Sequence, residues 1–186
     1  MIRIRFHGRG GQGSVVASQL LVEAAFREGK HVQAFPYFGV ERRGAPVTAF
    51  AKIDDNPIRD RSEIYTPNYV IVLDPSLVTV VNVIEGLKED GMVLVNTEKS
   101  PDELELDGVE KVATVDATSI AIEHGLGSRT APIVNSAMLG AFAKVSGLVS
   151  LDSLIDSILE SAPAKKEENA AAAKDAYGKV EVRSSQ

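Results

Sequence analysis

A cluster of four glycines near the start of the chain constrains the fold most. It reads His7-Gly8-Arg9-Gly10-Gly11-Gln12-Gly13. Before it, Ile2, Ile4 and Phe6 alternate with polar residues, which is typical of a half-buried strand, and after it apolar residues recur at helical spacing as far as Gly29. The cluster is therefore predicted to join a strand to a helix. Glycine permits positive φ and close backbone approach, and the free N–H groups of a helix start favour a phosphate.

This loop predicts a ligand-binding site. Its candidate residues are Gly8, Arg9, Gly10, Gly11, Gln12 and Gly13. Three of the glycines satisfy G-x-G-x-x-G, the pattern of dinucleotide-binding loops. However, the second predicted strand, residues 31–35, lacks the acid that would bind a ribose, and the loop lacks the Lys-Ser/Thr ending of nucleoside triphosphate loops. The alternative is a tight turn whose glycines serve only to pack the helix on the sheet.

The composition is that of a globular domain without redox side chains of its own. We expect a single domain, residues 1–186, because 44% hydrophobic and 25% charged residues are ordinary for this length. A net charge of −6 argues against nucleic-acid binding, and neither a membrane span nor a secretory leader is evident, so we expect a cytoplasmic protein. The chain has no cysteine and only three scattered histidines, so we expect no metal site and no catalytic residue.

Strand and helix patterns alternate through the middle of the chain. Continuous apolar runs at 69–73 and 92–96 are typical of strands buried on both faces of a parallel sheet. Further elements are predicted as strands at 47–53 and 112–116, a short return strand at 58–59, and helices at 76–87 and 117–124. We therefore expect an α/β fold, a three-layer α/β/α sandwich with a mixed, mostly parallel sheet.

The last third of the chain is predicted to be helical. Helical periodicity at 135–145 and 151–159 indicates two packing helices. Residues 165–177 are rich in alanine and mixed charges, which favours an exposed helix by propensity alone. The tail, residues 180–186, is expected either to be frayed or to contact a partner.

A second unusual segment, residues 35–46, is expected at the same sheet edge as the glycine cluster, because it also follows a strand of the sheet. It contains three aromatic residues, two prolines and an acid next to two arginines. Arg42 and Arg43 are candidates to clamp a phosphate or a partner's carboxylate. The alternative is an internal brace in which Glu41 pairs with one of these arginines.

Three polar residues at element boundaries are expected to cap helices. Asp74 and Asp116 stand at the ends of predicted strands, and Asn135 stands at the start of a predicted helix. With both acids used as caps, no acid–base pair remains beside the glycine loop.

The glycine cluster and residues 35–47, in this order, resemble the gamma subunit of 2-oxoacid:ferredoxin oxidoreductases, and within it the pyruvate branch. The run Asn135-Ser136-Ala137-Met138-Leu139-Gly140 and the overall length fit the same family. The resemblance implies a multi-chain enzyme of anaerobic metabolism that converts pyruvate, coenzyme A and oxidised ferredoxin to acetyl-CoA, carbon dioxide and reduced ferredoxin. It also implies alpha, beta and delta partner subunits, which hold thiamine diphosphate, Mg and the 4Fe-4S clusters.

On this resemblance the chain contributes assembly and coenzyme A binding at its interface, binds no cofactor by itself and has no activity alone. Two alternatives are a gamma subunit of a branched-chain 2-oxoacid or 2-oxoglutarate oxidoreductase, and a purely structural assembly domain without a ligand. A third, a free-standing enzyme using NAD or a flavin, is disfavoured by the missing ribose-binding acid.

Overall fold

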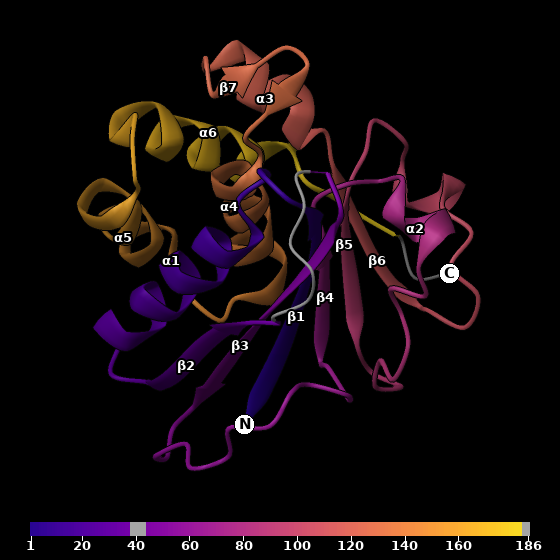
Figure 1. The fold of residues 1–186 in the computed structure, drawn as a ribbon, viewed down its shortest axis with the longest axis vertical. Coiled ribbons are helices and arrows are strands. Elements are labelled where there is room, and N and C mark those ends of the chain that lie inside the picture. Colours follow the sequence, from indigo (N-terminus) through magenta and orange to yellow (C-terminus); the bar gives the residue numbers. More distant parts are fainter. Residues whose placement is uncertain (38–43, 184–186) are drawn as a thin grey trace.

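The computed structural model describes residues 1–37 and 44–183, and at its centre is a seven-stranded sheet (Figure 1). The strands lie in the order β2-β3-β1-β4-β5-β6-β9. Their bounds are Ile2–Arg9 (β1), His31–Pro36 (β2), Pro46–Asp54 (β3), Tyr69–Val72 (β4), Met92–Asn96 (β5), Lys111–Val115 (β6) and Glu181–Val182 (β9). A separate hairpin pairs β7, Gly127–Ser128, with β8, Ala131–Pro132.

Most strands of the sheet run in one direction. β1, β4, β5 and β6 pair in parallel. β3 runs antiparallel between β1 and β2, which gives β2 the direction of β1, and β9 runs antiparallel at the other edge. The carboxyl ends of β1, β2, β4, β5 and β6 therefore lie along one edge of the sheet. This confirms the predicted α/β fold with a mixed, mostly parallel sheet.

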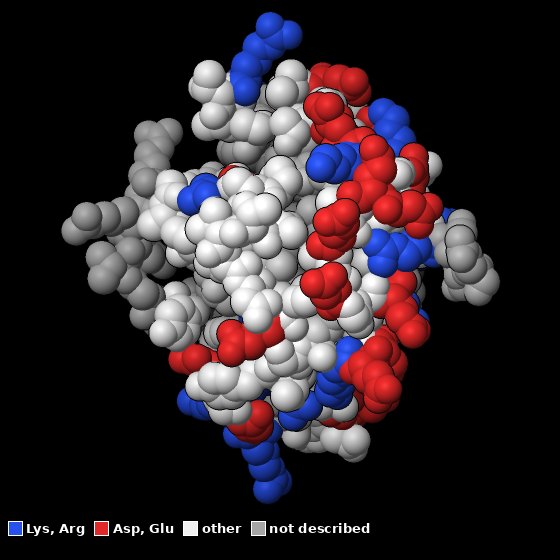
Figure 2. Space-filling view, turned by 90° about the vertical axis from the view of Figure 1, so that its right-hand side faces the viewer, with Lys and Arg blue, Asp and Glu red and all other residues white. Residues whose placement is uncertain are grey.

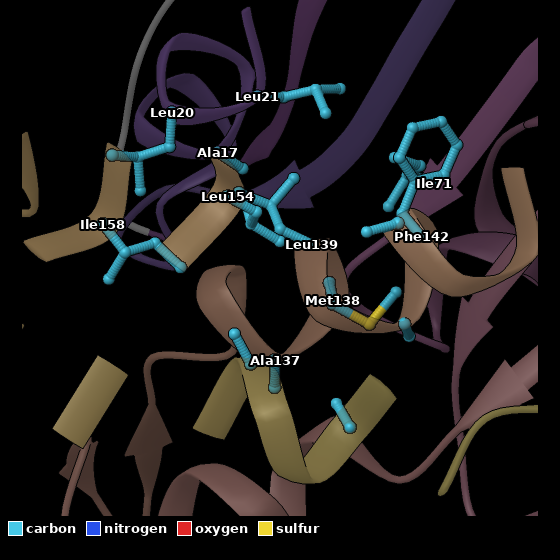
Figure 3. Close-up of a cluster of buried hydrophobic side chains, with 14 of the residues drawn as sticks. Ala17, Leu20, Leu21, Ile71, Ala137, Met138, Leu139, Phe142, Leu154 and Ile158 are labelled. Carbon is cyan, nitrogen blue, oxygen red and sulfur yellow. The ribbon is translucent and has the colours of Figure 1, made fainter. Parts of the chain in front are cut away.

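One face of the sheet is covered by the longer helices. They are α1 (Ser14–Arg27), α3 (Ala117–Glu123), α4 (Asn135–Ser146), α5 (Leu151–Ser161) and α6 (Lys166–Lys179). Alternate residues of β1, such as Phe6, are buried in this layer because side chains two apart on a strand share a face. Figure 3 shows side chains of α1, α4 and α5 gathered in this core with Ile71 of β4. The largest hydrophobic cluster of the described residues thus lies between sheet and helices.

The C-terminal helix α6 is packed into this layer. Ala170, Ala172, Ala173 and Ala176 are buried, and α6 lies against α4 and α5. A Cβ built on Gly140 of α4 would collide with the backbone carbonyl oxygen of Ala173, so the two helices touch backbone to backbone. The helix predicted over 165–177 is therefore confirmed as α6, but the expectation that it is exposed is wrong for the side that contains these alanines. A row of small residues lets a helix of low hydropathy bury one side.

The opposite face of the sheet is covered more thinly. The helix α2 spans only Leu77–Val80, so the predicted helix at 76–87 is wrong beyond its first turn. Valine recurs through this segment, and β-branched side chains disfavour the helix, whose end is marked by an extended Val81. Leu77 and Val83 nevertheless bury against the sheet and complete the third layer.

Buried cations hold the irregular segment that covers β1 and β3. Arg5 of β1 donates to the backbone carbonyl oxygens of Ile64, Val83 and Glu85. The fully buried Lys52 of β3 donates to the carbonyl oxygen of Ser62 at 2.7 Å and pairs with the Asp60 carboxylate at 3.1 Å. Residues 58–59 form no strand, so the predicted return strand is wrong; in the segment that follows them, cations bind the carbonyl groups of Asp60, Ser62 and Ile64.

The described part of the tail is paired with the sheet. Glu181–Val182 forms β9 against β6. The guanidinium of Arg183 donates to the carbonyl oxygens of Pro101, Leu104 and Val109. A frayed tail is therefore wrong as far as residue 183, and residues 184–186 lie outside the described residues. Among residues 1–37 and 44–183, no helix has the length and hydropathy that crossing a membrane requires.

Candidate functional site

The glycine loop lies at the point where successive parallel strands are added on opposite sides of β1. From β1 the chain turns to β2 on one side of the sheet, whereas the parallel neighbour of β1 on the other side is β4. The carboxyl ends of two such strands frame the crevice in which open α/β sheets bind ligands. The first two residues of the predicted loop, Gly8 and Arg9, are the last residues of β1, and residues 10–13 follow the strand. Asp74 comes after β4, so the glycine loop and Asp74 both stand at this edge, the upper one in Figure 1.

The loop conformation requires glycine at two positions. Gly11 has φ 94° and Gly13 has φ 84°, the left-handed region in which side chains are strained. A Cβ built on Gly11 would meet no described atom within 4 Å, so Gly11 faces open space. Gly10 is held through its backbone: its N–H donates to the Ala45 carbonyl oxygen at 3.0 Å, and its carbonyl oxygen accepts from the Gly44 N–H. The two unusual segments therefore meet at one sheet edge, as predicted.

Asp74 braces the loop from the end of the neighbouring strand. Its carboxylate accepts from Gln12 Nε2 at 2.9 Å and from the N–H of Ser76 at 3.0 Å, and Arg9 Nε lies 3.3 Å away. Arg9 also donates to the Gly44 carbonyl oxygen at 3.0 Å and to Ser76 Oγ at 2.8 Å. Both polar side chains of the loop, Arg9 and Gln12, are thus held in place by one carboxylate.

The pKa of Asp74 reflects this arrangement. Burial raises the pKa, but hydrogen bonds from Ser76 and Gln12 and the charge of Arg9 outweigh it and hold the pKa of Asp74 below its usual value. The carboxylate is therefore an ionised anchor. Asp74 is expected from the sequence to cap a helix; the N-cap residue of α2 is Ser76, two residues later, but the Asp74 carboxylate accepts from the N–H of this residue and so satisfies one donor at the start of the helix. Asp116 does cap α3, because its carboxylate accepts from the Ser119 N–H at 2.9 Å.

The N-terminus of α1 has no side-chain cap. Its N-cap residue is Gly13, and its first turn contains no acidic residue. Ser14 is 4% exposed, and its Oγ has no hydrogen-bond partner among the described residues. A Cβ built on Gly8 would collide with this hydroxyl, so Gly8 allows α1 to pack against the end of β1. The uncapped N–H groups carry the partial positive charge that favours an anion.

Asn135 contacts the glycine loop and does not cap α4. The N-cap of α4 is Val134, and Asn135 is the first helical residue. A Cβ built on Gly13 would lie 2.6 Å from Asn135 Nδ2, so the starts of α1 and α4 touch. The predicted capping role is therefore wrong, because a cap stands before the first helical residue.

Arg42 and Arg43 lie outside the described residues, together with Glu41, so their predicted roles stay predictions. The residues on either side of this segment, Tyr37 and Gly44, are described. The Tyr37 N–H donates to the Thr48 carbonyl oxygen at 2.9 Å, and Gly44 lies beside Gly10.

A hollow of about 250 Å³ lies elsewhere on the same sheet edge, at the carboxyl ends of β5 and β6. Its lining includes Thr97, Lys99, Asp116, Glu123 and Lys179. Asp116 already caps α3, and Lys179 pairs with Glu123 and Asp175. No group of three or more histidine, aspartate or glutamate side chains is placed to hold a metal in the described parts of the chain. The glycine loop, with its open N–H groups, remains the stronger candidate for a ligand.

Comparisons with known proteins agree with the resemblance seen in the motifs. The family model described as pyruvate ferredoxin/flavodoxin oxidoreductase matches residues 3–179. The chain is 59% identical over 182 residues to the pyruvate synthase subunit PorC of Methanothermobacter thermautotrophicus, covering 97% of each protein. It is 56% identical over 188 residues to the pyruvate/ketoisovalerate oxidoreductases common subunit gamma of Pyrococcus furiosus, covering 98% of each.

A crystal structure shows the same fold. It is the pyruvate oxidoreductase subunit PORC of Thermotoga maritima, with a TM-score of 0.82 and 37% identity over 98% of both chains. The family model, the two relatives and the shared fold lead to the same conclusion as the glycine loop. The chain belongs to the pyruvate ferredoxin/flavodoxin oxidoreductase family, as a gamma subunit of a pyruvate/2-oxoacid oxidoreductase.

Proposed function

We propose that this gamma subunit serves a thiamine-dependent complex that converts pyruvate, coenzyme A and oxidised ferredoxin to acetyl-CoA, carbon dioxide and reduced ferredoxin. Its own part is to join the alpha, beta and delta subunits in the cytoplasm and to hold coenzyme A at their interface. Pyruvate is favoured as the 2-oxoacid because two of the relatives are named for it. The name of the Pyrococcus furiosus subunit, common to pyruvate and ketoisovalerate oxidoreductases, keeps a branched-chain substrate as the second candidate.

The open start of α1 is the observation that supports coenzyme A binding. Coenzyme A carries a diphosphate and a ribose phosphate, and uncapped N–H groups at a helix N-terminus bind such anions. Gly11 leaves space in front of the loop, and the first turn of α1 has no acid that would repel a phosphate. Arg9 and Gln12 fit this role as well, because Asp74 holds both at the sheet edge.

The charge of the site is balanced by Asp74. Since Arg9 pairs with that carboxylate, it contributes less net positive charge than a free arginine. Backbone N–H groups therefore carry the larger share of the proposed phosphate contact, and Arg9 mainly orders the loop that presents them.

The dependence on partner chains is supported by the sequence and by the surface. The chain has no cysteine and so cannot supply thiolate ligands to an iron–sulfur cluster. Figure 2 shows a broad area free of charged side chains, bordered by a strip of acidic ones. Exposed apolar residues such as Tyr65 (70%) and Val80 (62%) are placed on the described surface. Uncharged surface with exposed aromatic residues is typical of protein contacts.

The purified chain is expected to show no pyruvate-dependent reduction of a viologen dye, because the electron carriers and the thiamine site belong to other subunits. Activity should appear when alpha, beta and delta subunits are added. Dye reduction is followed spectrophotometrically with coenzyme A present in both cases. Turnover by the chain alone would contradict the proposed division of labour.

Replacing Gly11 with alanine in the assembled complex is expected to raise the KM for coenzyme A about five- to tenfold while the KM for pyruvate stays unchanged. A side chain at φ 94° is strained by about 1 kcal/mol and displaces the N–H groups of the loop. Gly108→Ala is the matched control, because Gly108 also has positive φ (75°) and open space around it. Gly108 precedes β6, so it lies at the amino ends of the parallel strands, away from the glycine loop.

The two variants separate ligand binding from loss of stability. Both should lose a similar free energy of unfolding, and only Gly11→Ala should alter the coenzyme A constant. If the fully assembled Gly11→Ala complex has unchanged KM values for coenzyme A and pyruvate, the chain is a structural assembly domain without a ligand.

A further inference from the structure

The starts of two long helices meet at the glycine loop. Gly13, the N-cap of α1, contacts Asn135, the first residue of α4, with Nδ2 nearest to the loop glycine. Neither helix has a side-chain cap, and neither has an acidic residue in its first turn. The partial positive charges of both helix starts are therefore left without a compensating anion among these residues.

Asn135 is mostly buried, and neither N–H of its side-chain amide donates to a described residue. It is 5% exposed, and its Oδ1 accepts from the Ser136 N–H at 2.8 Å. Its Nδ2 has no hydrogen-bond partner among the described residues. Nδ2 is not among the described side-chain atoms that are both fully enclosed and without a partner, so this amide donor is open to an acceptor that comes from outside the chain.

A purely structural role for Nδ2 fits poorly. Helix starts need acceptors, because their unsatisfied groups are N–H donors. An amide nitrogen is a further donor and adds positive character to a place that already has it. At the start of α1, Ser14 Oγ is a buried polar atom without a partner among the described residues. Donors gathered without an acceptor match the chemistry of a phosphate.

We propose that Asn135 binds a phosphate group of the ligand held at the glycine loop, donating from Nδ2 beside the N–H groups of the first turn of α1. The inference rests on the proposed function, in which this ligand is coenzyme A. It adds a residue from α4, far along the chain from the glycine loop, to the site. It also assigns that residue to the phosphates and not to the thiol-bearing arm.

Replacing Asn135 with aspartate in the assembled complex tests this role, because the two side chains have nearly the same shape. Binding of coenzyme A, measured by calorimetry in the absence of pyruvate, is expected to weaken at least tenfold through charge repulsion. The melting temperature of the complex should stay level or rise, because a carboxylate at a helix start is favourable. Asn135→Ala, which removes the donor without adding charge, should weaken binding about three- to tenfold.

Two further ligands show which part of coenzyme A is involved. Pantetheine, which has no phosphate, should bind the wild-type complex and the Asn135→Asp complex equally. Dephospho-coenzyme A lacks the ribose phosphate, so the diphosphate is its only phosphate group. If Asn135 contacts the diphosphate, the variant weakens this ligand as much as coenzyme A, and if it contacts the ribose phosphate, the variant affects coenzyme A alone.

Asn169 provides the matched control. It is also buried, but its Nδ2 donates to the carbonyl oxygens of Ala164 and Lys165, and its Oδ1 accepts from Ser136. Asn169→Ala should lower the melting temperature and leave coenzyme A affinity unchanged. If Asn135→Asp and Asn135→Ala bind coenzyme A like the wild type while Gly11→Ala does not, the inference fails and the proposed function stands. If none of the three changes affinity, both fail.

Discussion

Replacing Gly140 with alanine is expected to lower the free energy of unfolding by about 2 to 3 kcal/mol, the cost of overpacking a close contact. The new Cβ would collide with the backbone carbonyl oxygen of Ala173 in α6. A backbone atom in a helix cannot move aside as a side chain can, so α6 has to shift away from α4. That shift loosens the buried alanine row of α6 and lowers the melting temperature by about 5 to 10 °C.

The result is checked by urea unfolding of the purified chain, with Gly178→Ala as the control. Gly178 also lies in a helix, α6, but a Cβ there meets nothing within 4 Å. Alanine is the better helix former, so this control should be neutral or stabilised by about 0.5 kcal/mol. Equal stability of the two variants would show that α4 and α6 do not touch as described.

Acidification from pH 6.5 to pH 4 is expected to remove up to about 3 kcal/mol of stability through His7 alone. Burial, together with the neighbouring Arg5 charge, lowers the pKa of His7 to about 4, and Arg5 Nε donates to His7 Nε2 at 3.0 Å. In the unfolded chain the histidine is protonated below about pH 6.5. The unfolded state therefore binds more protons between these values, so stability is complete above pH 6.5 and falls toward pH 4.

His7→Gln isolates this contribution, because a glutamine oxygen can still accept from Arg5 and does not titrate. The difference in unfolding free energy between wild type and His7→Gln should shrink as the pH falls from 6.5 to 4, which cancels the effect of carboxylates common to both proteins. The exposed His31, replaced in the same way, serves as the control. Parallel pH profiles for wild type and His7→Gln would contradict a neutral, half-buried His7.

Local patterns were sufficient where one element depends on its own residues. The alternation in residues 2–6 and the glycine run after it predicted β1, the loop and the start of α1, and the apolar runs predicted β4 and β5 as buried strands. Asp116 was predicted as a cap from its place at the end of a predicted strand, and its carboxylate accepts from the N–H of Ser119, only three residues later. In these cases period, turn chemistry and capping act within a few residues.

Partners distant in the chain were not predictable in the same way. Gln12 and Asp74 are 62 residues apart, and only the parallel pairing of β1 with β4 brings them together. In the segment predicted as a helix at 76–87, the burial of Leu77 and Val83 against the sheet was likewise not visible in local periodicity. The candidate site itself is divided in the same manner, since its glycines were visible in the sequence and its anchor Asp74 was not.

The sequence by itself determined the α/β fold class, the strand-loop-helix unit at residues 2–27 and the family, because periodicity, glycine spacing and motif order are written along the chain. The tertiary structure alone decided that α6 is buried by its alanines, that residues 181–182 join the sheet as β9, and that Asn135 meets Gly13. The physical reason is that these contacts depend on how close two backbones approach. That closeness follows from the packing of whole elements and leaves no periodic trace in either segment.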